Sequence, residues 1–471
     1  MDRHDRTTRG VELDVSLSGV PRGRRGAHLA DQLRAAIVSG RLEADGALPS
    51  SRQLATDLGV SRGLVVEVYA QLAAEGHLAT TSGSGTRVAP RPHPTRPSMP
   101  ERKASISTAR LSFATNNPGH PDPALFPRRD WHRALAAALR ELPDADLSYG
   151  DPRGLGELRT ALAGYVARVR SIIASPEQVI VVNGFAQGLV CIARHLVRVH
   201  GDPVVAVEDP GSVGTVEQLM AWGVRVVPVR VDDAGLDVDA LDRSDAVAVV
   251  VTPAHQYPTG VTLAPHRRHA LVAWARRREA LIVEDDYDAE YRYDRAPLTS
   301  LHNLDPDLVI AAGSISKSLS PALRLGWLIV PGHLADPLTE IKASIDLGAP
   351  TIPQAALARF IGSGGLDRHI RRTRGVYRRR RDALVGSLRD HAPDLDVDGI
   401  AAGLHVLIRL DDDMDENDLA VRARKLGLDA QPLGRYRCHR GPQGLVLGYA
   451  RQPPHRLQQA VAELFGEPDR V

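Results

Sequence analysis

Five prolines between Pro90 and Pro100 alternate with basic residues and interrupt every hydrophobic pattern in this part of the chain. Proline fixes its own φ angle and removes a backbone donor, so a regular helix or strand does not continue through such a segment. The sequence therefore predicts a stiff, extended and basic connector over residues 89–110. The connector separates a domain at residues 1–88 from a larger domain at residues 111–471, and any fold of this chain has to accommodate that division.

The composition is that of a globular protein of two or three domains, with 471 residues, 43% apolar and 25% charged. No apolar run approaches the ~20 residues of a membrane helix, and the polar first residues lack the apolar core of a signal peptide. Cys191 and Cys438 are the only cysteines, so a disulfide framework is excluded, and no cluster has metal-ligand spacing. We expect a cytoplasmic protein with no membrane partner and no metal. The net charge of +2 does not decide for or against nucleic acid.

Three short helical patterns and two strand-like runs follow each other over residues 26–88. The first helical pattern places apolar residues four apart on one stripe. The second begins at a serine N-cap within Leu48–Ser51 and the third at Ser61, and Gly59 forms the turn between them. The run 75–88 predicts two strands around a Gly/Ser turn. The pattern indicates a helix-turn-helix with a wing.

This arrangement places the start of the third helix at base edges and nearby hydroxyls and arginines at phosphates. We predict DNA contacts from Arg52, Ser61, Arg62 and Gly63. The alternative is a small helical cap without a ligand, because helix pairs joined by a glycine turn are common. The charges of the connector then belong either to a simple spacer or to a segment that follows the DNA backbone.

Beyond residue 111, apolar strand-like runs alternate with helical stretches. This alternation predicts a large, mainly parallel sheet covered by helices on both faces, with ligands beyond the carboxyl ends of the strands. The runs lie at residues 178–182, 203–207, 224–229, 246–251 and 280–283, and the helices include 154–170, 185–199 and 266–279.

Polar segments follow three of these runs. The turn 183–188 opens a helix whose free amides suit a phosphate, although most such turns are only turns. The segment 284–288 holds several carboxylates, which repel each other unless a cation binds there. The loop 252–260 holds His255, and a satisfied buried histidine is the alternative to a ligand-contacting one.

A lysine on a short polar turn is the strongest chemical signal. Lys317 lies among serines between two apolar runs, and Arg324 follows seven residues later. Such a setting suits a lysine that forms a Schiff base with an aldehyde beside groups that bind a phosphate. The candidate cofactor is pyridoxal 5′-phosphate (PLP), and the alternative is a solvated surface lysine.

Residues 25–88 closely resemble the winged helix of the GntR family. Residues from Leu111 to Leu464 resemble a class I aminotransferase of the PLP-dependent transferase fold (fold type I), with a large α/β/α sheet domain and a smaller α+β domain. Joined in one chain, the two are similar to the MocR/GabR subfamily of transcriptional regulators. The phrases that carry the resemblance include Leu48-Pro-Ser-Ser-Arg, Gly59-Val-Ser-Arg, His120-Pro-Asp-Pro, Tyr149-Gly-Asp-Pro and Glu208-Asp-Pro-Gly.

The resemblance implies a role for each residue that matches a family motif. Lys317 would form the internal aldimine with PLP and is the implied catalytic residue. Ser314 and Arg324, with the amides around Phe185 and Ala186, would bind the phosphate.

The same resemblance implies the ring contacts. Asp285 would pair with the pyridine nitrogen, Tyr287 would bond the ring oxygen, and His255 would lie among the ring-contacting side chains. Tyr149 would reach the phosphate of a neighbouring subunit, which implies a head-to-tail homodimer.

Three positions depart from the family pattern. Ser212 stands where an aromatic residue usually stacks on the cofactor ring, and Tyr257 replaces an asparagine. Val446 stands where aminotransferases place the arginine that holds the substrate carboxylate. Losing that arginine weakens the case for efficient transamination, because orientation of the substrate lowers much of the barrier.

We therefore predict a PLP-dependent, DNA-binding transcriptional regulator, cytoplasmic and nucleoid-associated when bound to double-stranded operator DNA. Its effector is PLP or an amino compound, sensed through the aldimine of Lys317, and at most partial transamination is expected. One alternative is an active aminotransferase with an accessory DNA-binding domain. Another is a DNA-binding protein whose body only dimerises.

Overall fold

A computed structural model describes residues 13, 15–81, 85–90, 117–293 and 298–466. The chain divides into two compact units between Ser105 and Ile106. Most of the predicted connector falls on residues 91–116, which lie outside the described residues. Each unit is considered by itself below.

The first unit is a helical core with a two-stranded wing. Ser50 caps the second helix by accepting a hydrogen bond from Gln53 N, and Ser61 caps the third by accepting one from Leu64 N. Gly59, with a φ of 62°, supplies the left-handed turn between these helices. The helix-turn-helix with a wing is confirmed. Its elements are η1 Arg22–Arg24, α1 Arg25–Val38, α2 Ser51–Leu58, α3 Arg62–Ala74, β1 Leu78–Thr81 and β2 Gly85–Val88.

The second unit is built on an eight-stranded sheet of order β3-β10-β9-β8-β7-β4-β5-β6. Strand β10 runs antiparallel to both of its neighbours, β6 runs antiparallel to β5, and the other neighbouring pairs are parallel. The strands are β3 Val179–Val182, β4 Val204–Asp209, β5 Arg225–Asp232, β6 Gly235–Leu236, β7 Ala248–Val251, β8 Leu281–Asp286, β9 Val309–Ser314 and β10 Gly326–Ile329.

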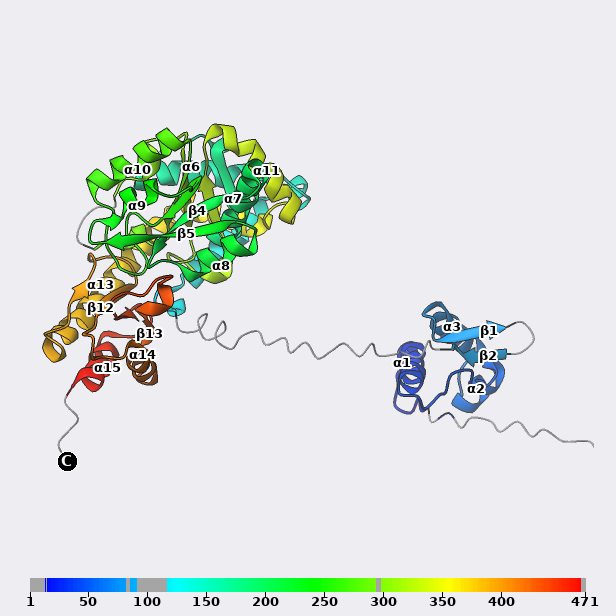
Figure 1. The fold of residues 1–471 in the computed structure, drawn as a ribbon. Helices are drawn as coiled ribbons and strands as arrows, with labels where there is room; N and C mark the ends of the chain where they lie inside the picture. Colours follow the sequence, from blue (N-terminus) through cyan, green and yellow to red (C-terminus); the bar gives the residue numbers. More distant parts are fainter. Residues whose placement is uncertain (1–12, 14, 82–84, 91–116, 294–297, 467–471) are drawn as a thin grey trace, which may run out of the picture. The chain divides into compact units, whose positions relative to one another are not determined.

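Helices cover both faces of this sheet (Figure 1), and alternate strand residues show why. In β3, Val179 and Val181 pack into one core cluster, whereas Ile180 and Val182 pack into another. Strands buried on both faces are continuously apolar, as the sequence predicted. The helices are α5 Arg128–Glu141, α6 Gly156–Arg170, α7 Phe185–His200, α8 Val213–Ala221, α9 Val238–Asp242, α10 Pro265–Arg278, α11 Gly332–Asp346 and α12 Thr351–Gly362.

A smaller α+β domain, orange to red in Figure 1, completes the second unit. Its antiparallel sheet has the order β11-β12-β14-β13. The predicted fold class is thereby confirmed. The strands are β11 Val397–Asp398, β12 His405–Arg409, β13 Asp429–Pro432 and β14 Gly444–Gly448, and the helices are α13 Gly365–His391, α14 Glu416–Lys425 and α15 Pro454–Phe465.

Short 3-10 helices connect several of these elements. They are η2 Pro123–Leu125, η3 Asp144–Leu147, η4 Pro176–Gln178, η5 Ala289–Tyr291, η6 Leu301–Asn303, η7 Pro321–Leu323 and η8 Leu433–Tyr436. Among the described residues, none of the helices has the length and apolar character needed to cross a bilayer.

Candidate cofactor site and nucleic-acid interface

The sheet topology brings the polar segments to one edge. Strands β7, β8 and β9 are parallel neighbours, and β3 has the same direction as β9 because both pair antiparallel with β10. Asp285 near the end of β8, Ser314 at the end of β9 and the turn after β3 therefore lie at the carboxyl edge, where such sheets bind ligands.

The turn between β3 and α7 forms a cradle for an anion. Gly184 has a φ of 80°, and a Cβ there would lie 3.4 Å from Nη1 of Arg324. Nη2 of Arg324 donates to the carbonyl of Asn183 at 2.6 Å. The first amides of α7, those of Phe185 and Ala186, have no acceptor within the helix and carry the positive end of its dipole. A guanidinium and a helix N-terminus facing one glycine turn suit a phosphate.

Arg324 and Ser314 add a guanidinium and a hydroxyl to this anion cradle. Arg324 has a φ of 51°, a conformation that costs energy for a residue with a side chain. The Ser314 hydroxyl accepts the Ser316 amide at 3.3 Å and keeps a proton to donate. The four phosphate-site residues of the sequence analysis therefore sit on elements that converge at one carboxyl edge.

Lys317 is half-buried beside carboxylates. Burial lowers the pKa of its ammonium, and the charges of Asp288 and Asp285 oppose that shift. Burial raises the pKa of Asp285 to about 7, and the charge of Lys317 opposes it. No carboxylate lies within ion-pairing distance of Lys317 in the part of the chain that the structure describes. A buried amine without an ion pair is more easily deprotonated, and the neutral amine is the nucleophile.

His255 belongs to a buried cluster beside this lysine. Its Nδ1 lies 2.9 Å from Oδ2 of Asp288 and 3.1 Å from the Tyr287 hydroxyl. Its ring lies 5.1 Å from that of His405, centroid to centroid. A Cβ on Gly403, whose φ is 70°, would collide with both His255 and Asp288. His255 is thus a satisfied histidine that also orients Tyr287.

The structure adds Asn117, Gly119 and Tyr436 to the residues expected around Lys317. A Cβ at Gly119 would lie 3.5 Å from Nζ of Lys317, so the segment at residues 117–119 covers the lysine. The Tyr257 hydroxyl donates to Tyr436 at 3.0 Å and lies 3.4 Å from Oδ1 of Asn117. Neutral hydroxyl and amide groups therefore line this side of the site.

The positions of two family departures are also explained. The Ser212 hydroxyl accepts the Thr215 amide at 3.3 Å and caps α8. Val446 is completely buried in β14, paired with Leu407 of β12, and it packs with Tyr436. Val446 thus lies in an apolar cluster, at the position where the family resemblance leads us to expect an arginine.

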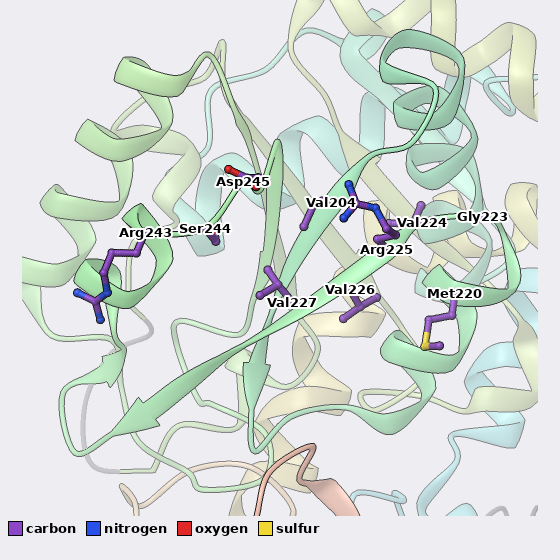
Figure 2. A pocket seen from close by; sticks show the side chains of 10 residues that line it. All are labelled: Val204, Met220, Gly223, Val224, Arg225, Val226, Val227, Arg243, Ser244 and Asp245. Carbon is purple, nitrogen blue, oxygen red and sulfur yellow. The ribbon is translucent and has the colours of Figure 1, made fainter.

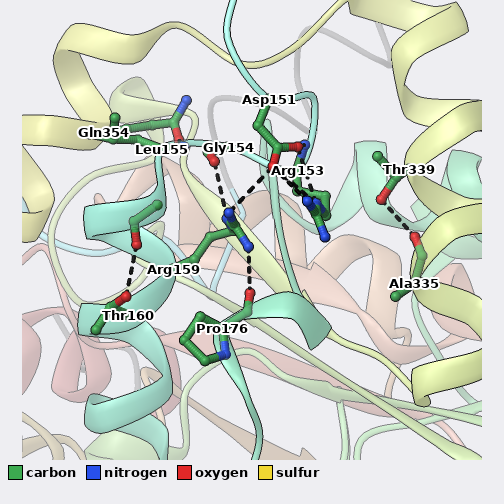
Figure 3. Close-up of polar contacts among 11 residues, drawn as sticks. Asp151, Arg153, Gly154, Leu155, Arg159, Thr160, Pro176, Ala335, Thr339 and Gln354 are labelled. Atoms are coloured by element: carbon green, nitrogen blue, oxygen red, sulfur yellow. Dashed lines mark hydrogen bonds and ion pairs between the residues drawn. The ribbon is translucent and has the colours of Figure 1, made fainter. Parts of the chain in front are cut away.

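Tyr149 projects from a firmly held loop. Its side chain is 86% exposed. Asp151 accepts from Arg153 at 2.9 Å and from Arg159 at 3.3 Å, and Gln354 accepts the Leu155 amide at 2.8 Å (Figure 3). An exposed aromatic side chain on a braced loop is available to a second molecule.

The predicted DNA contacts lie at two helix starts of the first unit. Arg52 in the first turn of α2, and Arg62 and Gly63 in the first turn of α3, are exposed. Neither arginine side chain makes a hydrogen bond or an ion pair with the described residues. Ser61 is engaged as the cap of α3, which orients the same turn. The structure therefore leaves both guanidinium groups free for phosphates or base edges.

One hollow on the second unit lies away from this edge. It has a volume of about 780 Å³ and lies at the start of β5, at the opposite edge of the sheet from Lys317. Figure 2 shows that its charged side chains, Arg225, Arg243 and Asp245, point apart. Charged side chains that point apart do not bind one ligand together. This hollow is therefore a poorer ligand site than the edge that carries Lys317.

Fold and site together define a PLP-type aminotransferase body joined to a winged helix, and comparisons with known proteins agree. Residues 111–426 match the family "Aminotransferase class I and II", and residues 25–88 match the "Bacterial regulatory proteins, gntR family". Two solved structures share the fold, each with a TM-score of 0.69. An archaeal alanine:glyoxylate aminotransferase is 25% identical and covers 77% of this chain and 95% of its own. The multiple substrate aminotransferase of Thermococcus profundus is 28% identical, with 78% and 95% covered.

Two curated relatives match both units. The probable rhizopine catabolism regulatory protein MocR of Rhizobium meliloti is 34% identical over 93% of this chain and 92% of its own length. The pyridoxine biosynthesis transcriptional regulator PdxR of Corynebacterium glutamicum is 35% identical over 93% and 94%. The chain belongs to the MocR subfamily of GntR-type transcriptional regulators, in which a winged helix is fused to an aminotransferase-like domain.

Proposed function

We propose that the second unit binds PLP covalently at Lys317 and uses the bound cofactor as a sensor that controls DNA binding by the winged helix. PLP supplies an electrophilic aldehyde and an electron-withdrawing ring. The observation that carries the proposal is the half-buried Lys317, which forms no ion pair with the described residues and lies at the same carboxyl edge as a phosphate cradle.

The chain's own residues have distinct tasks around that cofactor. The α7 amides, Ser314 and Arg324 bind the phosphate. Asp285 accepts a hydrogen bond from the protonated ring nitrogen, and a cation there offsets the burial that raises the pKa of this carboxyl to about 7. Tyr287, held by His255, donates to the ring oxygen. In a head-to-tail homodimer, Tyr149 of one subunit reaches the phosphate of the other.

A sensor is favoured over an enzyme by the apolar residue at position 446. Val446 stands where the family resemblance leads us to expect the arginine that orients the substrate carboxylate, and its side chain is apolar and buried beside Tyr436. The effector is PLP itself or an amino compound, and one relative is named for the regulation of pyridoxine biosynthesis. For regulation, the effector has to bind two arrangements of the protein with different affinity. Bound to its operator, such a protein acts at the nucleoid in the cytoplasm.

A working aminotransferase with an accessory DNA-binding domain is the second candidate. It is favoured by the shared fold and by the presence of Lys317, Asp285 and Arg324 together. Release of a keto acid in stoichiometric excess over protein would establish turnover, whereas a spectral change that stops at one equivalent would establish sensing.

The scarcity of lysine makes the attachment test sharp, because the sequence has four lysines: Lys103, Lys317, Lys342 and Lys425. The full-length protein is mixed with PLP, reduced with borohydride and digested, and the modified peptide is identified by mass. We expect one adduct on Lys317, none in Lys317→Ala, and an unchanged adduct in Lys425→Ala, which removes an exposed lysine of α14. An adduct that persists in Lys317→Ala would refute the proposal.

A further inference from the structure

Helix α13 carries a concentration of positive charge that the cofactor site does not use. Its 27 residues include nine arginines and three aspartates, a net charge of +6 with histidines neutral. The whole chain has a net charge of +2, so the rest of the chain carries −4. The net positive charge of this protein is therefore concentrated on α13.

Five of these arginines form a stripe along the solvent face of α13. Each lies three, four or seven residues from another member, spacings that recur on one side of a helix, and together they extend over about 17 Å at 1.5 Å per residue. The opposite face holds the buried Leu366, Thr373, Tyr377 and Leu384. The stripe consists of Arg368, Arg371, Arg372, Arg378 and Arg379, and Arg389 near the end of the helix is also exposed.

These charges are poorly compensated within the protein. Arg371 and Arg379 make no side-chain hydrogen bond or ion pair with any described residue, and Arg378 lies 3.9 Å from its nearest carboxylate. Arg368 and Arg372 donate to backbone carbonyls at 2.8 Å and 3.2 Å, which leaves their charge in place.

Helix α10 shows the contrasting arrangement. Arg276 pairs with Asp305 at 2.6 Å, and Arg277 and Arg278 pair with Asp242 at 3.2 Å and 3.6 Å. The arginines of α10 therefore tie that helix to its surroundings. Within the α13 stripe, Arg372 contacts the Leu125 carbonyl of a neighbouring segment, whereas Arg371 and Arg379 make no such contact with the described residues.

The positive surface continues beyond α13. Arg372 contacts the carbonyl of Leu125, and the exposed Arg128 and Arg129 follow Leu125 closely in the chain. Neither forms an ion pair with a residue that the structure describes, whereas the neighbouring Arg133 pairs with Asp130. The stripe and the start of α5 thus form one basic surface.

We infer that this surface binds the sugar–phosphate backbone of DNA, so that the aminotransferase-like unit adds its own contacts to those of the winged helix. Guanidinium groups bind phosphates through paired hydrogen bonds, and a row of them matches the regular negative charge of a duplex. The stripe has no aromatic or large apolar anchors, which a protein–protein interface or a membrane surface would need. The inference does not depend on PLP.

The test uses the full-length protein and a labelled duplex of about 30 base pairs of mixed sequence, and it follows affinity between about 50 and 200 mM KCl. Each phosphate contact contributes about −0.9 to the slope of log K against log salt. The double variant Arg371→Ala with Arg379→Ala should make that slope shallower by about 1.8. The control Arg276→Ala with Arg277→Ala removes the same charge from α10 and should keep the wild-type slope.

Two results would overturn the inference. If both double variants give the wild-type slope, the stripe is a solvated surface only. If the α13 variant keeps its slope for DNA but loses binding to polyglutamate, the stripe serves an acidic protein. Thermal unfolding of each variant provides the folding control, and exposed arginines without partners should leave it unchanged.

Discussion

Two lysines of the second unit differ in whether the ammonium group has an ion-pair partner. This difference separates a structural lysine from a functional one. Lys342 is completely buried in α11 and pairs with Asp346 at 2.9 Å. Lys317 is half-buried and has no carboxylate within ion-pairing distance among the described residues. Removing water from either ammonium group is unfavourable, but in Lys342 the ion pair with Asp346 offsets this free energy. Lys317 is left with an amine whose pKa is lowered and which an aldehyde can capture.

The arginines also divide into those that have an ion-pair partner among the described residues and those that do not. Arg34 in α1 is held by Glu75 at 2.9 Å and by Asp31, whereas Arg62 in α3 makes no such contact with the described residues. Arg276 is paired in α10, and Arg371 is not paired in α13. Cations with a partner stabilise this fold, and cations without one are available for ligands.

The comparison is tested most strongly at Lys342. Removing it leaves Asp346 without its ion pair in a largely buried position, so Lys342→Ala should lower the free energy of unfolding by about 3 kcal/mol. Asp346 also accepts hydrogen bonds from Asn183 and Gln187 in the β3–α7 turn, so PLP binding should weaken as well. Urea unfolding of the PLP-free protein measures the first effect. Lys317→Ala should change that free energy by less than about 1 kcal/mol.

Lys342→Met provides the matched control, because methionine keeps the apolar stem of the side chain. It should destabilise the protein nearly as much as Lys342→Ala. Equal stability of Lys317→Ala and Lys342→Ala would show that pairing does not distinguish the two lysines.

Asp285 extends the comparison to a carboxylate. Its pKa is raised to about 7, so between about pH 4 and 7 the PLP-free native state binds a proton that the unfolded state has released. Stability should therefore fall as pH rises through this range. Asp285→Asn should remove that loss and be more stable than wild type at pH 8 by roughly 2 kcal/mol, discounted for partial solvent exposure.

The same variant should retain PLP poorly, because the ring nitrogen loses its carboxylate partner. Thermal unfolding at pH 5 and pH 8, with and without PLP, separates the two effects. Destabilisation of PLP-free Asp285→Asn at pH 8 would contradict this account of the site.

In the first unit, Arg62 and Arg34 allow the same comparison, with DNA affinity as the measured quantity. Arg62→Ala should weaken binding by about 1.5 kcal/mol if the side chain contacts a base, since one good contact is worth about 1–3 kcal/mol. Arg34→Ala should leave DNA affinity unchanged, because its guanidinium is held by Glu75 and Asp31. Affinity is measured on a duplex selected from a random pool. Equal losses in the two variants would remove Arg62 from the interface.

The smallest expected effect concerns Ser61, which has a structural partner. Ser61→Ala removes the N-cap of α3 and should lower the stability of the first unit by about 1 kcal/mol. Ser61→Asp keeps an acceptor at the cap and should restore stability while repelling phosphates. If Ser61→Asp binds DNA as tightly as wild type, the start of α3 does not face the backbone.

Local interactions explain what the sequence could predict. The caps at Ser50 and Ser61 join atoms three residues apart, so the helix starts were visible in the sequence. The strand ends followed from continuous apolar runs, which only a sheet buried on both faces accommodates. The pairing of Lys342 with Asp346, four residues apart on a helix, is equally local.

Long-range contacts explain what it could not. Asn117 and Tyr436 meet Tyr257 across 140 and 179 residues of chain, and no local pattern marks either. The link between His255 and Asp288 likewise depends on the packing of two strand ends. Single-sequence patterns located the edges of the site, and tertiary packing decided which side chains cover Lys317.

The most direct test of the central claim compares DNA affinity with and without PLP for wild type and Lys317→Ala, on the selected duplex. PLP should change the affinity of the wild-type protein, and Lys317→Ala should bind DNA like the PLP-free wild type and ignore added PLP. A Lys317→Ala protein whose DNA affinity responds to PLP as the wild type does would contradict the claim that this lysine couples the cofactor to DNA.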